Sequence, residues 1–132
     1  MKCMPDTNIC IYVIANRSVE LGKKFRQMVR DDISVPVIVA SELAYGLTKS
    51  RLLEKKRAAL ELFLSSLSVQ AMADSAMWHY ADLHRHLERQ VQLIGESDQW
   101  IAAQALATDS VMVTNNRTEF DRVSGLGVEN WI

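Results

Sequence analysis

Short apolar runs alternate along the chain with longer stretches in which apolar residues recur every three or four positions. The runs at 1–4, 33–37, 67–71, 110–114 and near the end of 125–132 are brief and bounded by polar or turn-forming residues, which is typical of strands. The longer stretches have helical spacing. This alternation predicts an α/β fold with a short, mostly parallel central sheet of 4–5 strands and helices on both faces.

The predicted helices differ in how clearly their buried faces can be assigned. Four segments have an apolar face: Ile11, Ile14 and Ala15; Leu21, Phe25, Met28 and Val29; Leu53, Leu60, Phe63, Leu64 and Leu67; and Met77, Tyr80, Ala81, His84, Leu87 and Val91. The helix through Ala107 is rich in alanine, which allows close packing against a sheet. Pro36 is expected near the end of the second strand, because proline cannot donate to a ladder.

Capping residues predict where several helices begin. Thr7 and Asn8 are good N-cap types for the first helix. A helix starting between residues 39 and 41 would place Glu42 in an early turn, and Ser97 as N-cap would place Asp98 at the first helical position. Either Asp74 or Ser75 can cap the long helix that follows them.

The length of 132 residues and the hydrophobic content of 48% predict one domain, residues 1–132, with one core. No apolar run is long enough to span a bilayer, and the first residues lack the features of a signal peptide, so we expect a cytoplasmic protein without a membrane partner. Cys3 and Cys10 lie in or beside apolar stretches and are expected to be buried, reduced thiols.

The formal net charge is -1, which does not by itself indicate nucleic-acid binding. Basic residues nevertheless gather in three clusters: Lys23, Lys24, Arg26 and Arg30; Lys49, Arg51, Lys55, Lys56 and Arg57; and Arg85 and Arg89. Such clusters usually form solvated helix faces. If several acids collect in one pocket, however, the remaining surface is more basic than the total charge implies.

Four acidic residues follow strands or open helices: Asp6, Glu42, Asp98 and Glu119. Each has an ordinary explanation as a helix cap or as a charge that complements the helix dipole. Independent caps would not need to converge, but ligands of open α/β sheets bind beyond the carboxyl ends of the strands, where these residues are expected. The sequence therefore predicts one acidic pocket.

Four motifs then resemble those of the PIN-domain family, and more closely the VapC ribonuclease toxins of bacterial toxin–antitoxin pairs. They are Met4-Pro5-Asp6-Thr7-Asn8, Ser41-Glu42-Leu43 with Gly46, Gly95 with Asp98, Ile101 and Ala102, and Val113-Thr114-Asn115-Asn116 with Glu119-Phe120. The resemblance implies a PIN-like fold and a Mg²⁺- or Mn²⁺-dependent endoribonuclease. In this interpretation Asp6, Glu42 and Asp98 are the core acids, and the products carry a 5′-phosphate and a 3′-hydroxyl.

The chain departs from the family pattern at two positions. Many PIN domains have an acid where Asn116 stands, and Glu119 looks like the substitute used in a related branch, while Asn116 keeps an oxygen that can bind a metal or its water. Both residues therefore stay candidates for the fourth place. Pro5 stands where an aliphatic residue is usual, and it removes one N–H from a predicted central strand.

The chemistry of the acids agrees with the resemblance. Hard divalent cations prefer oxygen ligands, and closely spaced carboxylates repel each other, so at least one raised pKa is expected. The resemblance also implies an RNA substrate, with tRNA and the anticodon loop of initiator tRNA as the plausible target, a VapB antitoxin whose C-terminal segment enters the acidic pocket, and a homodimer.

Two alternatives stay open from the sequence alone. A haloacid-dehalogenase-type phosphatase also places an Asp after its first strand, but it needs a second Asp where Asn8 stands. A non-catalytic PIN-like module that binds RNA or an antitoxin is favoured by Asn116. His79, His84 and His86 lack the i, i+4 spacing of a metal pair and are interpreted as surface or packing residues.

Overall fold

The computed structural model describes residues 2–28 and 30–132, and its short strands all pair in parallel. The strands are β1 (Cys3–Pro5), β2 (Ser34–Pro36), β3 (Ser68–Gln70), β4 (Val111–Val113) and β5 (Val128–Glu129). One sheet has the order β1-β4-β5 and the other pairs β2 with β3. An isolated parallel bridge between Cys3 and Ile33 places β2 beside β1. The predicted parallel α/β architecture is confirmed.

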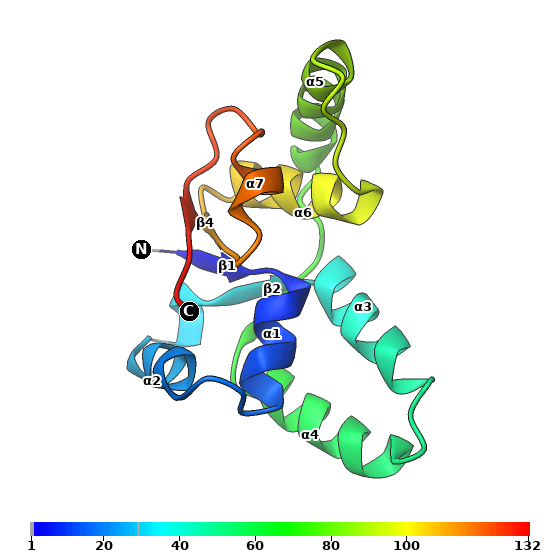
Figure 1. The fold of residues 1–132 in the computed structure, drawn as a ribbon, viewed down its shortest axis with the longest axis vertical. Helices are drawn as coiled ribbons and strands as arrows, with labels where there is room; N and C mark the ends of the chain where they lie inside the picture. The colour runs from blue at the N-terminus through cyan, green and yellow to red at the C-terminus, as the bar shows by residue number, and fades with distance from the viewer. Residues whose placement is uncertain (1, 29) are drawn as a thin grey trace.

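Helices cover the strands on two sides, as Figure 1 shows. The elements α1 (Thr7–Ile14), α2 (Val19–Gln27), α3 (Val37–Leu47) and α4 (Leu53–Ser65) lie on one side. On the other side are α5 (Ala76–Arg89), α6 (Glu96–Ala107) and α7 (Arg117–Phe120), while a 3-10 turn, Arg30–Asp32, precedes β2. None of the described helices is both long and apolar enough to cross a bilayer.

The core forms where α6 and α3 meet the sheet. Ile101, Ala102 and Ala103 of α6 are fully buried, as the small residues of this helix predict. They belong to the same cluster as Met4 of β1 and Met112 of β4. Each large apolar side chain buried in this way contributes about 1.5–3 kcal/mol to folding. The core thus joins the body of α6 to β1 and β4.

Pro5 is the last residue of β1, where its missing N–H limits pairing on one side only. Alternate residues of a strand direct their N–H groups to opposite neighbours, and the N–H of Asp6 donates to the Val113 carbonyl of β4 at 2.9 Å. The nitrogen of Pro5 therefore faces β2 and has no hydrogen to donate there. This explains why β1 pairs with β4 over three residues but meets β2 only at one bridge.

Three predicted helix starts are wrong by a few residues. Pro36 ends β2 as predicted, but α3 begins directly after it at Val37, so Glu42 lies in the second turn. Gly95, not Ser97, is the N-cap of α6, which places Asp98 third in the helix. Asp6 rather than Thr7 or Asn8 caps α1.

The predicted faces of the longer helices need similar corrections. In α5 the buried residues are Ala76, Leu83 and Leu87, whereas Met77 is exposed and Val91 lies beyond the helix end. Leu53 of α4 is also exposed. Two positions of predicted elements, Met1 in the first strand and Val29 in the second helix, lie outside the described residues. Cys3 and Cys10 are buried free thiols, as expected.

Candidate active site

Asp6 stands at the junction of β1 and α1 and is tied to the protein through both carboxylate oxygens. Oδ1 accepts a hydrogen bond from the N–H of Ile9 at 2.9 Å, which caps α1. Oδ2 accepts a hydrogen bond from the Thr114 hydroxyl at 2.5 Å. Burial raises the pKa of Asp6, and these hydrogen bonds oppose that change because they favour the charged form. Asp6 therefore caps α1 and can also serve as the predicted site residue.

Thr114 is a site residue to which sequence reasoning gave no role. It follows β4, which pairs in register with β1, so Thr114 and Asp6 leave neighbouring strands at the same edge. Its hydroxyl donates to Asp6 and accepts the N–H of Asn116 at 2.9 Å. The sequence places this hydroxyl at the end of the predicted strand 110–114, but its partner is distant in the chain.

Glu42 is linked to the first helix. Its Oε1 accepts a hydrogen bond from the Thr7 hydroxyl at 2.9 Å, which joins α3 to the residue that follows Asp6. The helix dipole acts mainly on the first turn, so it does not explain an acid in the second turn of α3. A local helical role therefore accounts poorly for Glu42.

The pKa of Asp98 is affected by the three other candidate acids. Its pKa is raised to about 6, first by burial, then by the hydrogen bonding and charge of Glu119, and then by the charges of Glu42 and Asp6. Like charges disfavour ionisation, so the raised pKa is the physical result of carboxylates from β1, α3, α6 and α7 lying near one another. The raised pKa expected of closely spaced acids is found at Asp98, and the four acids as one site stay a prediction.

Asn116 and Glu119 occupy different positions at the edge of this pocket. Asn116 is the N-cap residue of α7, but its side chain makes no capping hydrogen bond, and it is held through its backbone N–H. Glu119 lies within α7 and interacts directly with Asp98. The structure thus brings Glu119 into the acidic cluster, while Asn116 stands beside it next to Thr114.

The donor set of this pocket fits a hard divalent cation. All four acids offer carboxylate oxygens, and the charge that raises the pKa of Asp98 is the charge that a cation would neutralise. Among residues 2–28 and 30–132, no three His, Cys, Asp or Glu side chains are already arranged to hold one ion. Mg²⁺ needs only one or two protein carboxylates, with water and phosphate completing its shell, so the residues present are sufficient.

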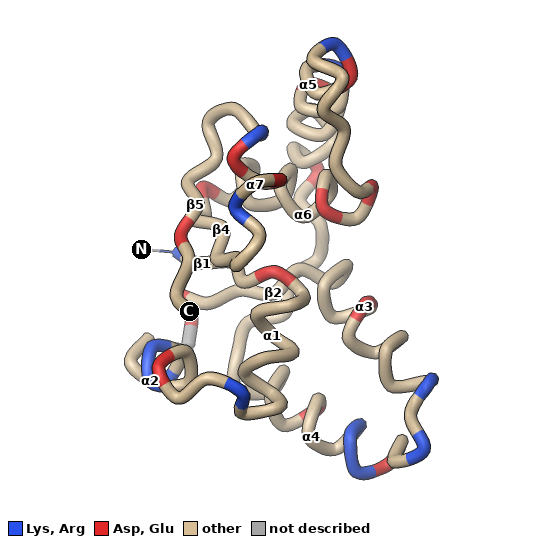
Figure 2. The backbone as a smooth tube through the Cα atoms, viewed as in Figure 1, with Lys and Arg blue, Asp and Glu red and all other residues tan. Residues whose placement is uncertain are grey.

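A groove of about 470 Å³ lies between α1, α3 and α4, with Glu42 in its lining. Apolar residues form most of its walls, including Ile11, Ile14, Leu43, Leu47 and Leu60, and the cations Arg17, Lys55 and Lys56 also line it. Figure 2 shows several Lys and Arg residues where α3 and α4 meet. The groove therefore brings the carboxylate of Glu42 and three cations to one largely apolar surface.

The three histidines lie on α5. His86 is exposed, and His84 is half-buried against Tyr80 and Gln99. Their interpretation as surface and packing residues agrees with these surroundings. Arg117, at the start of α7, pairs with Asp121 at 3.4 Å.

Known proteins match this chain along its whole length. The family profile described as the PIN domain matches residues 3–126. Ribonuclease VapC2 of Haemophilus influenzae is 39% identical over 132 residues, covering 100% of this chain and 99% of the relative. The tRNA(fMet)-specific endonuclease VapC of Shigella flexneri is 35% identical over 131 residues, covering 99% and 98%. VapBC2 of Rickettsia felis, solved with a DNA fragment from its promoter, superposes with a TM-score of 0.94 at 34% identity over 100% of both chains.

Proposed function

The chain belongs to the PIN-domain family, and we propose that it is a divalent-metal-dependent endoribonuclease toxin of a toxin–antitoxin pair. The observation that carries this function is the gathering of acids from separate elements around Asp98, whose pKa is raised to about 6 by burial and then by Glu119, Glu42 and Asp6. Relatives that span the whole chain are named ribonucleases, which supports the same activity. One domain, residues 1–132, is proposed to hold the complete site.

The proposed ion is Mg²⁺ or Mn²⁺. The proposed ligands are the carboxylates of Asp6, Glu42, Asp98 and Glu119, with the side-chain oxygen of Asn116 beside them. When bound, such an ion lowers the pKa of water and neutralises charge that builds on the scissile phosphate. No covalent intermediate with the protein is needed for this hydrolysis.

Hydrogen bonds within the protein orient two of the carboxylates that would hold the ion. Thr114 and the Ile9 N–H hold the Asp6 carboxylate in one orientation. The hydrogen bond from Thr7 orients Glu42. Burial of Asp6 and partial burial of Asp98 keep bulk water away, which strengthens their attraction for a cation. Carboxylates that are oriented before binding lose little freedom when the ion arrives.

The proposed substrate is tRNA, with the anticodon loop of initiator tRNA as the specific target. The name of the Shigella relative, a tRNA(fMet)-specific endonuclease, supports this choice. The exposed basic residues at the junction of α3 and α4, including Lys49, Arg51 and Lys56, provide phosphate contacts beside the groove. Recognition of a folded RNA by shape and phosphate contacts suits such a surface.

The proposed partners are a VapB-type antitoxin and a second copy of this chain. The apolar groove between α1, α3 and α4 suits an amphipathic segment of the antitoxin, and a basic residue of that segment could reach Glu42 at the edge of the acidic pocket. Solved relatives are complexes named VapBC, which supports the antitoxin. The homodimer follows from the family resemblance alone.

A binding module without catalysis is the second candidate, and Asn116 in place of an acid favours it. The decisive experiment incubates total tRNA with the wild type and with Asp6→Asn, each with Mg²⁺ and with EDTA. Asp74→Asn, at an exposed position, is the matched control. We expect a discrete product from the wild type and Asp74→Asn with Mg²⁺ only. Bound but uncut RNA in every lane would favour the binding module instead.

A further inference from the structure

The helix that carries Asp98 begins without a side-chain cap. Gly95 is the N-cap residue of α6 and has no side chain to bind the free N–H groups of the first turn. Glu96 and Asp98 both lie in that turn, and Asp98 faces three other acids. Repulsion among these acids would push the turn away from the site. Some other contact must therefore hold the start of α6 in place.

Gln99, the residue directly after Asp98, makes that contact. Its side chain is 2% exposed, and its Nε2 donates to the Ile94 carbonyl at 2.9 Å, just before the helix. Its backbone N–H donates to the Gly95 carbonyl at 3.0 Å. Gln99 thus closes the first turn of α6 from its side chain and from its backbone.

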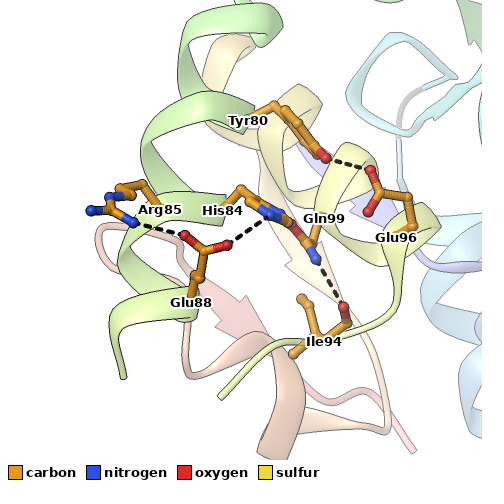
Figure 3. A network of polar contacts seen from close by, with 7 residues as sticks. All are labelled: Tyr80, His84, Arg85, Glu88, Ile94, Glu96 and Gln99. Carbon is orange, nitrogen blue, oxygen red and sulfur yellow. Dashed lines mark hydrogen bonds and ion pairs between the residues drawn. The ribbon is translucent and has the colours of Figure 1, made fainter. Parts of the chain in front are cut away.

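The other end of the Gln99 amide is held by α5. Its Oε1 lies 2.6 Å from Nδ1 of His84. Because the Ile94 carbonyl can only accept, Nε2 must face it and Oε1 must face His84, so His84 Nδ1 carries the proton. Figure 3 shows Gln99 between His84 and Ile94, with Tyr80 of the same helix directed at Glu96.

Aromatic stacking strengthens the same junction. The ring of Tyr80 lies parallel to Trp100 of α6, with centroids 4.0 Å apart and an interplanar angle of 3°. The ring of His84 stacks on the Tyr80 ring at 5.5 Å. Tyr80 and His84 are one helical turn apart on α5, and together they contact Glu96, Gln99 and Trp100 in the first half of α6.

We propose that Gln99, held by His84, is a positioning residue that fixes the start and rotation of α6 and thereby aims Asp98 at the other acids, a role that rests on the proposed metal-dependent function. Successive residues of a helix point about 100° apart, so fixing the side chain of Gln99 fixes the direction of Asp98. Residues that orient the ligands of a metal site typically change metal affinity or activity about 10–100-fold when they are replaced. The amide of Gln99 acts in this way without touching substrate.

Gln104 offers a matched control on the same helix. It is 1% exposed, and its side chain also makes two hydrogen bonds to backbone, with Ala73 N at 2.8 Å and Ala71 O at 3.2 Å. It lies in the second half of α6, away from the turn that carries Asp98. Replacing either glutamine by Met keeps the approximate volume and removes two side-chain hydrogen bonds of a buried residue.

The experiment measures Mn²⁺ binding by calorimetry and thermal unfolding for the wild type, Gln99→Met and Gln104→Met. Both variants are expected to lower Tm by a similar amount, roughly 5 °C. Only Gln99→Met is expected to weaken Mn²⁺ binding, about tenfold, and to lower kcat for RNA with KM little changed. Equal Mn²⁺ affinity in wild type and Gln99→Met, or equal weakening in both variants, would overturn the positioning role.

A second variant covers the case in which Gln99→Met does not fold. His84→Leu removes the donor to Gln99 Oε1 at a half-buried position and is expected to weaken Mn²⁺ binding in the same direction, by about threefold. Unchanged affinity in this folded variant would contradict the role of His84. Wild-type protein that binds no Mn²⁺ while folded would refute the metal-dependent function itself, and the positioning role with it.

Discussion

Asp6 and Asp98 belong to one acidic cluster, but the protein holds them in opposite ways. Asp6 accepts hydrogen bonds from Thr114 and from the Ile9 N–H, and one of these caps α1. Asp98 is partly buried beside other acids, and burial first and then the charges of those acids raise its pKa to about 6. Asp6 therefore serves the fold and the site together. Asp98 serves the site at a cost to stability, and its place depends on how α6 is anchored.

The largest expected effect is on cleavage, where the two acids should behave alike. Asp98→Asn and Asp6→Asn each remove a charge that attracts the cation, and metal catalysis contributes several kcal/mol to such reactions. A loss of about 4 kcal/mol corresponds to a cleavage rate roughly 10³-fold lower. Initial rates on the same tRNA, with circular dichroism to confirm folding, check this expectation. A folded Asp98→Asn variant with the wild-type rate would remove Asp98 from the site.

Without metal, replacing Asp6 and replacing Asp98 should change the free energy of unfolding in different ways. Asp6→Ala removes a helix cap and the acceptor of the Thr114 hydroxyl, which together cost about 2 kcal/mol. Asp98→Ala instead removes a repelling charge and is expected to leave stability unchanged or higher. Urea unfolding in EDTA gives both values. If Asp98→Ala is destabilised as much as Asp6→Ala, the two carboxylates are anchored alike and the contrast between them is wrong.

The sequence predicted this contrast only in part, because it shows local roles better than distant ones. It placed Asp6, Glu42, Asp98 and Glu119 at the ends or starts of elements, and topology then brought them together. It could not show that Thr114 bonds Asp6, because those residues are 108 positions apart. Only the parallel register of β1 and β4 makes them neighbours.

The missed helix starts have a similar cause. Ser97 is a better N-cap type than Gly95, yet α6 begins at Glu96, where Gln99 bonds the Ile94 carbonyl and Tyr80 reaches Glu96. Those contacts come from tertiary packing against α5, which local preference does not contain. The buried face of α5 differs from the prediction for the same reason, since Leu83 joins the core and Met77 is exposed.

The smallest expected effect is on the pH dependence of stability, and its sign depends on Asp98. Its pKa rises from 3.8 to about 6 on folding, so between these values the folded state holds more protons than the unfolded state. Stability in EDTA must therefore fall as the pH rises through this window. From about pH 5 to pH 7 the loss should be on the order of 1 kcal/mol, after allowance for solvent screening of a partly exposed carboxylate. Asp98→Asn removes this titration, so its advantage over the wild type should grow with pH. Urea unfolding at about pH 5, 6 and 7 measures the difference, and a constant gap between the two proteins would show that Asp98 does not carry the repulsion of the cluster.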